Sequence, residues 1–257
     1  MTAPNISNPT YFAAASPVRL PRAAALGPGL GGQPRLLVDA PAGAAEIYLH
    51  GATVTSWTPR GGSEVIFTSR QAVFNGSTAI RGGIPLCLPE FGVGINGDAV
   101  PKHGWARIAP WQLRTVTGTD DGGVRALLSV SRDHLTALYE VEVGQTLRLG
   151  LSLRNDGAEP RTVEAAAHTY LSVHDVTASI ISGLAGSSYN DNLARSSQEA
   201  RRIQEGDVKI SGPVDRIYDS SEPVAVTDPG HRRTIRIDKR NAPSTIVWNP
   251  WSTYSAP

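Results

Sequence analysis

The sequence lacks most of the features that would assign a chain to a disulfide-rich, membrane or nucleic-acid-binding class. Cys87 is its only cysteine, which excludes an internal disulfide and a metal site built from several thiolates. No apolar run is long enough to span a bilayer, and 24 basic and 23 acidic residues leave a formal net charge of only +1. This balance predicts neither a nucleic-acid partner nor a membrane surface. Any electrostatic recognition must come from local clusters.

Helical periodicity is also scarce, and period-two alternation is present instead. In residues 138–143, three apolar side chains fall on one face of an extended chain, and Glu140 and Glu142 fall on the other. Residues 146–154 repeat the pattern with four leucines, so we predict two half-buried antiparallel strands with one wet face. Short β-prone runs bounded by turn residues predict further strands at 35–39, 45–49, 53–57, 63–67, 111–116, 124–131, 161–170, 177–183, 207–210, 223–227, 234–238 and 244–248.

The strand series favours an all-β chain, a large antiparallel β-sandwich. One helical turn or two is considered within residues 193–204, although their apolar positions form no clear stripe. Residues 1–32, rich in alanine, proline and glycine, are predicted to be a poorly ordered or loosely packed lead-in without the features of a secretory signal. Residues 33–257 are predicted to form a single domain. Without targeting or disulfide signals the cytoplasm is the expected location, and no pattern indicates an oligomeric state.

Residues 80–111 combine glycines and prolines with cationic side chains and one imidazole. The prolines disfavour a regular helix, and the glycines let a ligand approach the main chain closely. The cationic side chains are Arg81, Lys102 and Arg107, and the imidazole is that of His103. Loops on a rigid scaffold are where binding and catalytic groups concentrate, so this segment is a candidate ligand site. The alternative is a surface loop whose charges are simply solvated.

Two of the six histidines, His103 and His168, have surroundings that suit a site. His168 follows three alanines at the end of a predicted strand, where a purely structural histidine would fit equally well. Imidazole titrates near neutrality, which suits proton transfer. Cys87 lies in an apolar run and is predicted to be a small buried hydrophobe, with a nucleophile as the alternative. No HExxH motif, GxSxG elbow or phosphate-binding P-loop is present.

Six segments carry a resemblance when they are taken in order: LHGATVTSW at 49–57, IRGGIP at 80–85, HGWAR at 103–107, HTY at 168–170, DRIY at 215–218 and VWNPW at 247–251. Together they resemble the hexose-6-phosphate mutarotases, or glucose-6-phosphate 1-epimerases, of the aldose 1-epimerase (galactose mutarotase-like) superfamily. The resemblance implies a galactose mutarotase-like supersandwich with an open sugar cleft and no metal or organic cofactor. It implies an EC 5.1.3-type isomerase that interconverts the α and β anomers of an aldohexose 6-phosphate, most simply glucose 6-phosphate, with this small-molecule sugar phosphate as its partner.

The resemblance also implies a role for each site residue. His168 would be the acid that protonates the ring oxygen, and His103 would hydrogen-bond the sugar and stabilise the charge that develops there. Arg81 and Arg107 would hold the phosphate, a role that suits the guanidinium fork. Asp215 would accept hydrogen bonds from sugar hydroxyls. The alternatives are a surface ion pair with Arg216 for Asp215 and solvated charges for the two arginines.

Two positions depart from the family's pattern. Lys102 stands where the family usually has glutamine, and its charge is expected either to strengthen binding of the substrate anion or to change which hydroxyl is contacted. The family's general base is a glutamate near the C-terminus, whereas no glutamate follows Glu222. We therefore expect a sandwich short of its C-terminal strand or strands: either the native sequence is longer than this chain, or turnover is impaired by about 10² to 10⁴. Glu90 could replace this base, but nothing in its spacing argues for that role. The alternatives are a non-catalytic sugar-phosphate-binding β-sandwich and an interaction module.

Overall fold

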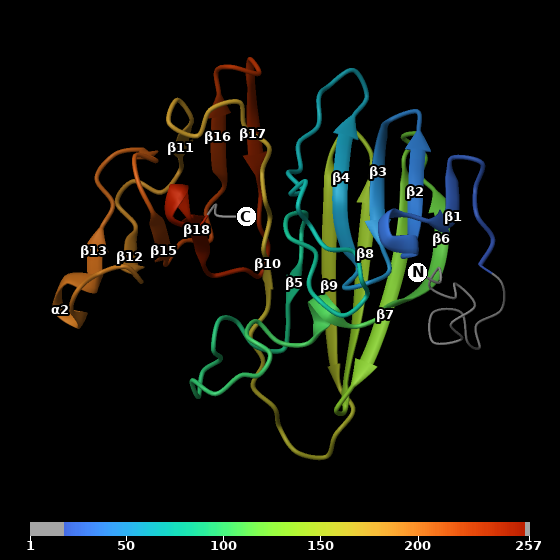
Figure 1. Ribbon diagram of the computed structural model, residues 1–257, viewed down its shortest axis with the longest axis horizontal. Coiled ribbons are helices and arrows are strands. Elements are labelled where there is room, and N and C mark those ends of the chain that lie inside the picture. The colour runs from blue at the N-terminus through green and yellow to red at the C-terminus, as the bar shows by residue number, and fades with distance from the viewer. Residues whose placement is uncertain (1–17, 255–257) are drawn as a thin grey trace. The chain divides into compact units, whose positions relative to one another are not determined.

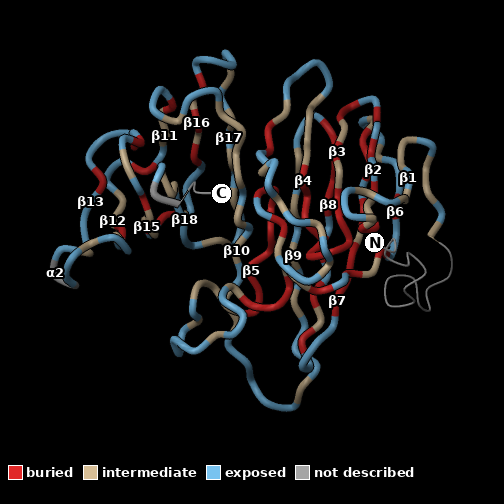
Figure 2. The backbone as a smooth tube through the Cα atoms, in the orientation of Figure 1, coloured by how far each residue is buried: buried red, intermediate tan, exposed pale blue. Residues whose placement is uncertain are grey.

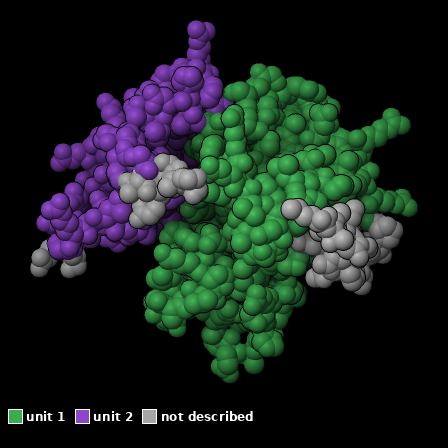
Figure 3. Space-filling model, in the orientation of Figure 1, with its two compact units in different colours: residues 1–172 green, residues 173–257 purple. Residues whose placement is uncertain are grey.

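The computed structural model describes residues 18–254, and residues 1–17 and 255–257 lie outside the described part. The chain divides into two compact units, residues 1–172 and residues 173–257 (Figure 3). Both consist of antiparallel strands (Figure 1), as the all-β prediction requires. The prediction of a single domain over residues 33–257 stays a prediction. No helix within residues 18–254 is long and apolar enough to cross a membrane.

The first sheet of unit 1 joins four strands in chain order: β1 (Ala24–Pro28), β2 (Pro34–Ala40), β3 (Gly43–Tyr48) and β4 (Thr53–Pro59). Buried and more exposed side chains alternate along β2, because successive residues of a strand point to opposite faces. Residues 1–17 of the predicted lead-in are outside the described residues. In its remainder, β1 pairs with β2 along its whole length, and η1 (Leu30–Gly32) joins the two strands. Ordered sheet therefore begins before residue 33.

The second sheet of unit 1 is a meander of β6 (Gln112–Gly118), β7 (Val124–Arg132), β8 (Leu135–Val143) and β9 (Leu147–Asn155). The predicted alternation in β8 is confirmed, since its three apolar side chains at 139, 141 and 143 are buried. The prediction that Glu142 faces solvent is wrong. Its side chain is only 9% exposed, because Arg125 at 2.5 Å and Arg148 at 3.0 Å, on neighbouring strands, pair with it. Two guanidinium groups satisfy a carboxylate that could not be buried alone.

The two four-stranded sheets of unit 1 pack together and enclose its core. β3 contacts β8, and the Trp57 indole N–H donates to the carbonyl of Gly144 at 3.2 Å, which ties β4 to the turn between β8 and β9. Figure 2 shows buried residues concentrated along these strands. Leucines such as Leu36 and Leu128 are completely buried, and each contributes about 1.5–3 kcal/mol to the free energy of unfolding. This core is the frame on which the loops of unit 1 are held.

A short strand pair carries the histidine-bearing segments. β5 (Leu86–Cys87) pairs with β10 (Ala166–Ala167), and three backbone bonds extend the ladder: Glu164 N–H to Pro89, His168 N–H to Pro85 and Tyr170 N–H to Gly83. The strand predicted at 161–170 is thus regular at two residues only. The partner segment explains this, because a proline accepts a ladder bond but has no N–H to return one. The strand predicted at 63–67 is reduced to an isolated bridge between Ile66 and Leu171.

Unit 2 contains two four-stranded sheets. One has the order β14 (Val208–Lys209), β11 (Ile180–Ser182), β16 (Val224–Asp228) and β17 (Arg233–Ile237), and the other β13 (Arg201–Ile203), β12 (Ser188–Asp191), β15 (Val214–Tyr218) and β18 (Thr245–Asn249). Leu184, Tyr189 and Tyr218 belong to its core. The helical turn considered for residues 193–204 is limited to α2 (Ser197–Ala200), which Ser196 caps, and β13 follows directly. The last described element is η3 (Trp251–Tyr254).

Candidate active site

His168 is placed by the irregular ladder between residues 83–89 and 164–170. It directly follows β10, and its backbone N–H donates to the carbonyl of Pro85 at 3.0 Å. Tyr170 donates in the same way to Gly83, at 2.9 Å. Residues two apart in an extended chain point to the same face, and the His168 and Tyr170 rings are stacked with centroids 4.8 Å apart. The imidazole of His168 is therefore supported by an aromatic ring.

His103 lies in a turn whose backbone is left-handed. Its φ is +66°, and Gly104 follows with φ +71°. A Cβ at position 104 would lie 2.2 Å from the carbonyl oxygen of Leu88, so only glycine fits there. A non-glycine residue with positive φ persists only where its surroundings hold it, often at functional sites. Here the backbone N–H of His103 donates to the carbonyl of Gly92 at 2.7 Å, and its carbonyl accepts from Leu88 at 3.2 Å.

Several contacts orient the His103 ring. Phe91 lies edge to face against it, with centroids 5.1 Å apart. Its Nδ1 accepts a hydrogen bond from the backbone N–H of Gly92 at 3.1 Å, and the Cys87 sulfur lies 3.5 Å from the same nitrogen. The ring faces His168, with centroids 6.0 Å apart and planes 87° apart. The structure therefore brings together the two histidines that the sequence singles out.

Positive charge surrounds this pair. The pKa of His103 is lowered to about 4, first by burial and then by the charges of Arg107, His168 and Lys102. His103 is therefore a neutral imidazole at neutral pH. Burial raises the pKa of the Tyr170 hydroxyl, and the charges of Arg107 and Arg81 act against that shift. Both arginines thus lie within electrostatic reach of the ring that stacks on His168.

Arg107 is anchored by its own loop. It belongs to η2 (Ala106–Ile108), and its Nη2 donates to the carbonyl of Lys102 at 2.8 Å. A guanidinium has five N–H donors, so this bond orients the group and leaves donors for a ligand. Arg81 and Lys102 are exposed side chains. We use the term histidine site for the group that these contacts and charges define: Arg81, Lys102, His103, Arg107, His168 and Tyr170.

Cys87 is completely buried, as predicted. Burial raises the pKa of its thiol to about 11, although the charge of Arg107 opposes the shift. A thiol that stays protonated at neutral pH is a poor nucleophile. The structure therefore gives no support to the nucleophile alternative.

Asp215 belongs to unit 2, where it lies on β15 opposite Trp248 of β18. Its carboxylate accepts a hydrogen bond from the side-chain amide of Asn192 at 2.9 Å. Within the described residues, Arg216 is ion-paired with Asp191, at 3.9 Å, and lies over the Tyr189 ring, at 5.0 Å. The alternative of an Asp215–Arg216 ion pair is therefore not what the structure shows. The predicted sugar contact of Asp215 stays a prediction.

Residues 34–256 match the sequence profile of the aldose 1-epimerase family. The chain belongs to this family. A provisionally named glucose-6-phosphate 1-epimerase from Cenchrus ciliaris is 32% identical to this epimerase over 226 residues, which cover 80% of the chain and 67% of that protein. The crystal structure of YeaD, a provisionally named mutarotase from Salmonella typhimurium, superposes with a TM-score of 0.80 at 28% identity, over 93% of this chain and 81% of that one.

A galactose mutarotase-like protein from Clostridium acetobutylicum shares the fold at only 11% identity, with a TM-score of 0.68 over 88% of this chain and 83% of that one. The family model and the Cenchrus ciliaris relative confirm the predicted family, and the solved structures confirm the galactose mutarotase-like sandwich. The prediction of an enzyme of the epimerase type, EC 5.1.3, is confirmed as well.

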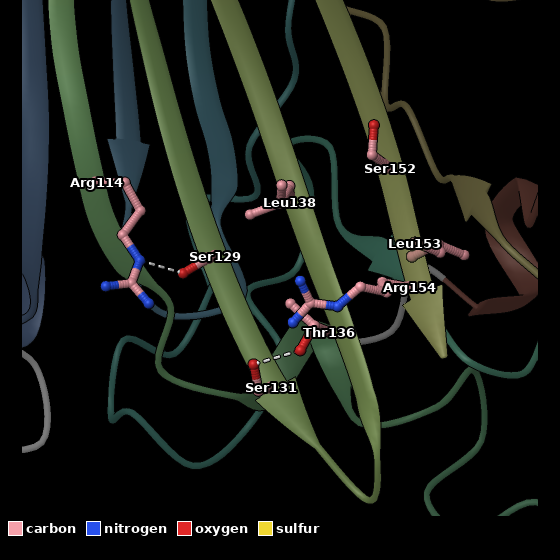
Figure 4. Close-up of a pocket in the computed structure, with 8 residues that line it drawn as sticks. All are labelled: Arg114, Ser129, Ser131, Thr136, Leu138, Ser152, Leu153 and Arg154. Carbon is pink, nitrogen blue, oxygen red and sulfur yellow. Dashed lines mark hydrogen bonds between the residues drawn. The ribbon is translucent and has the colours of Figure 1, made fainter. Parts of the chain in front are cut away.

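A surface depression of about 320 Å³ in this epimerase lies apart from the histidine site. It occupies the solvent-facing side of the sheet β6–β9 and is lined by Arg114, Ser129, Ser131, Thr136, Leu138, Ser152, Leu153 and Arg154 (Figure 4). None of the predicted site residues lines it. Many of its polar groups bond to protein, for example Arg114 to Ser129 at 2.6 Å and Arg154 to Asp156 at 2.5 Å. Because many of its polar groups already bond to protein, this depression is a weaker candidate for a ligand site than the histidine site.

The sequence interpretation of this epimerase missed Tyr170, Phe91 and the Gly92 amide. Tyr170 had a usable signal, because it stands two residues after His168 in a predicted strand and must share its face. Phe91 and Gly92 had none. They reach His103 through a turn with consecutive positive φ angles, and that geometry has no periodic pattern.

Proposed function

We propose that this epimerase interconverts the α and β anomers of an aldohexose 6-phosphate, with glucose 6-phosphate as the first substrate to test and the cytoplasm as its location. The observation that carries the proposal is the edge-to-face pair of His103 and His168, 6.0 Å apart, beside the charges of two arginines. The name of the Cenchrus ciliaris relative supports a phosphorylated substrate.

Anomer exchange requires one proton delivered to the ring oxygen and another removed from the anomeric hydroxyl. The ring opens, C1 rotates, and closure reverses both transfers. In the proposal, His168 delivers the proton to the ring oxygen. Neutral His103 hydrogen-bonds the sugar and stabilises the charge that develops as the ring opens. A water molecule takes the proton of the anomeric hydroxyl in this scheme.

Arg81 and Arg107 are the proposed phosphate ligands. Hydrogen bonds between guanidinium and phosphate are charge-assisted and frequently bidentate, which gives both energy and orientation. The bond from Arg107 to the Lys102 carbonyl fixes the direction of this group before a ligand arrives. Lys102 adds a third positive charge, which favours a dianionic ligand over a free sugar. Asp215 is the proposed acceptor for sugar hydroxyls.

NMR exchange spectroscopy on glucose 6-phosphate tests the activity directly. We expect exchange between the two anomers to accelerate in proportion to enzyme concentration, and more for glucose 6-phosphate than for glucose. Exchange no faster than in buffer would reject the catalytic role. Calorimetry then separates the remaining cases: tighter binding of the phosphorylated sugar would leave a non-catalytic sugar-phosphate-binding sandwich, and equal or absent affinity would remove the phosphate site.

A further inference from the structure

The hydrogen bond from Gly92 to His103 determines where the imidazole proton lies. The backbone N–H of Gly92 is 3.1 Å from Nδ1 of His103, and a backbone N–H can only donate. Nδ1 must therefore present its lone pair. In a neutral imidazole the other nitrogen then carries the proton, so His103 has its N–H at Nε2.

Cys87 approaches the same nitrogen. Its sulfur lies 3.5 Å from Nδ1, and it stays a protonated thiol at neutral pH because burial raises its pKa to about 11. Nδ1 has a single lone pair, which already accepts from Gly92, so the thiol can take part in this contact only as a second donor that shares it. Cys87 also pairs with Ala166 across β5 and β10, two residues before His168. The same short ladder thus positions both Cys87, which contacts His103, and the backbone of His168.

We propose that Cys87 is a positioning residue which, together with the Gly92 amide, locks His103 as the Nε2–H tautomer, so that His103 acts on the substrate as a hydrogen-bond donor and not as an acid. The imidazolium form would need a proton on Nδ1 pointing at the Gly92 N–H. Arg107, Lys102 and His168, the charged or titratable groups that act on the ring, oppose that form too. The catalytic meaning of the lock rests on the proposed function, but the tautomer itself does not.

Long-range ¹H–¹⁵N NMR of the ¹⁵N-histidine-labelled protein tests the lock without any assay of activity. The His103 signals are assigned by their loss in His103→Gln. We expect an unprotonated Nδ1 and a protonated Nε2 at all pH values above the pKa of about 4. A protonated Nδ1 at neutral pH, in either the other tautomer or the imidazolium, would overturn the inference.

Two substitutions separate the thiol's hydrogen bond from its bulk. Cys87→Ala removes the donor, whereas Cys87→Ser keeps one. The neutral form loses a hydrogen bond in Cys87→Ala, so the pKa of His103 should rise by up to about one unit, the size expected for one weak hydrogen bond. Cys87→Ser should keep the native value. Ile84→Val controls for the loss of volume from the same buried run. Equal pKa changes in Cys87→Ala and Ile84→Val would show that Cys87 only fills space and would overturn its positioning role.

Steady-state kinetics of the Cys87 variants measure the effect of the lock on catalysis. With glucose 6-phosphate, Cys87→Ala should lower kcat several-fold with little change in KM, and Cys87→Ser should keep most of the native kcat. If the wild type shows no anomer exchange but the expected tautomer, the proposed function fails and the lock stands. If exchange is fast but Nδ1 is protonated, the lock fails and the function stands.

Discussion

The His103 and His168 rings meet edge to face, with centroids 6.0 Å apart and planes 87° apart. The two imidazoles have different supports. Main-chain groups of a left-handed turn hold His103, whereas His168 stacks on Tyr170 at the end of a strand. The lowered pKa of His103 keeps that ring neutral, which suits a hydrogen-bond donor, and the acid role is therefore proposed for His168.

Replacing the proposed acid should remove most of the activity. His168→Asn keeps a polar side chain of similar size but cannot deliver a proton, so we expect anomer exchange of glucose 6-phosphate to fall by about 10² to 10⁴. Exchange NMR measures the rate, and circular dichroism checks the fold. His134→Asn is the matched control, because His134 is an exposed turn residue with φ +58°, a conformation that asparagine tolerates. A His168→Asn enzyme that keeps more than about a tenth of the native rate would remove His168 from the acid role.

Arg107→Ala should discriminate between phosphorylated and free sugar. A lost hydrogen bond to a charged group costs about 1.5–3 kcal/mol, so the dissociation constant of glucose 6-phosphate should rise about ten- to a hundredfold. The affinity for glucose should change little. Isothermal titration calorimetry measures both. Arg114→Ala, on the solvent face of the sheet β6–β9, should leave both affinities unchanged. Equal weakening of both ligands by Arg107→Ala would argue that it disturbs the loop instead of a phosphate contact.

Asp215→Ala, unlike Arg107→Ala, should not discriminate between phosphorylated and free sugar. If its carboxylate binds sugar hydroxyls, glucose and glucose 6-phosphate should weaken by similar factors, about ten- to a hundredfold for a charged acceptor. The same calorimetric series measures this. Asp219→Ala is the control, because Asp219 is an exposed aspartate of the same unit that pairs with Arg201. Unchanged affinity for both sugars in Asp215→Ala would take Asp215 out of the site.

Two glycine substitutions separate backbone strain from steric clash. Gly97→Ala places a side chain at φ +78° in open space, so it should cost about 1–2 kcal/mol of the free energy of unfolding. Gly104→Ala adds a Cβ 2.2 Å from the Leu88 carbonyl oxygen, so we expect a loss of about 3 kcal/mol or more. Urea denaturation measures both. Similar losses in the two variants would mean that the turn at Gly104 relaxes easily and does not hold His103 rigidly.

The lowered pKa of His103 makes stability depend on pH. Its pKa falls from the ordinary 6.5 to about 4, so between these values the unfolded chain binds more protons than the folded one. Unfolding is therefore favoured as the pH is lowered through this window, with a slope from His103 below about 1.4 kcal/mol per pH unit, the limit for one proton. In His103→Gln this part of the slope should disappear. Urea denaturation of both proteins across the window measures it, and identical slopes would contradict the shift.

The strands with strict alternation were predictable, and the irregular segments were not. β8 and β9 follow from alternating apolar residues, since only one face of each strand can be buried. β1 escapes prediction because AALGP has no alternation, and its order comes from pairing with β2. The burial of Glu142 depends on Arg125 and Arg148 of two other strands, which no local pattern records.

In the candidate site, too, some features could be predicted from the sequence and others could not. His103 and His168 could be singled out from their motifs, and their proximity follows once β5 pairs with β10 and the backbone N–H of Leu88, next to β5, donates to the His103 carbonyl. The tautomer of His103 could not be foreseen, because it depends on a backbone amide that is brought to the ring by a turn with positive φ angles.

The clasp between Gly92 and His103 joins the two ends of a surface loop. The His103 backbone N–H donates to the Gly92 carbonyl at 2.7 Å, and the Gly92 backbone N–H donates to Nδ1 of His103 at 3.1 Å. Neither bond uses a side chain of residues 93–100. Ile95 and Val100, 74% and 94% exposed, project into solvent from that stretch. Because doubling a loop's length adds only about 0.6 kcal/mol to its closure, new sequences could be grafted there without displacing the imidazole. Residues 93–100 are thus a suitable segment in which to vary the sequence while the orientation of His103 is kept.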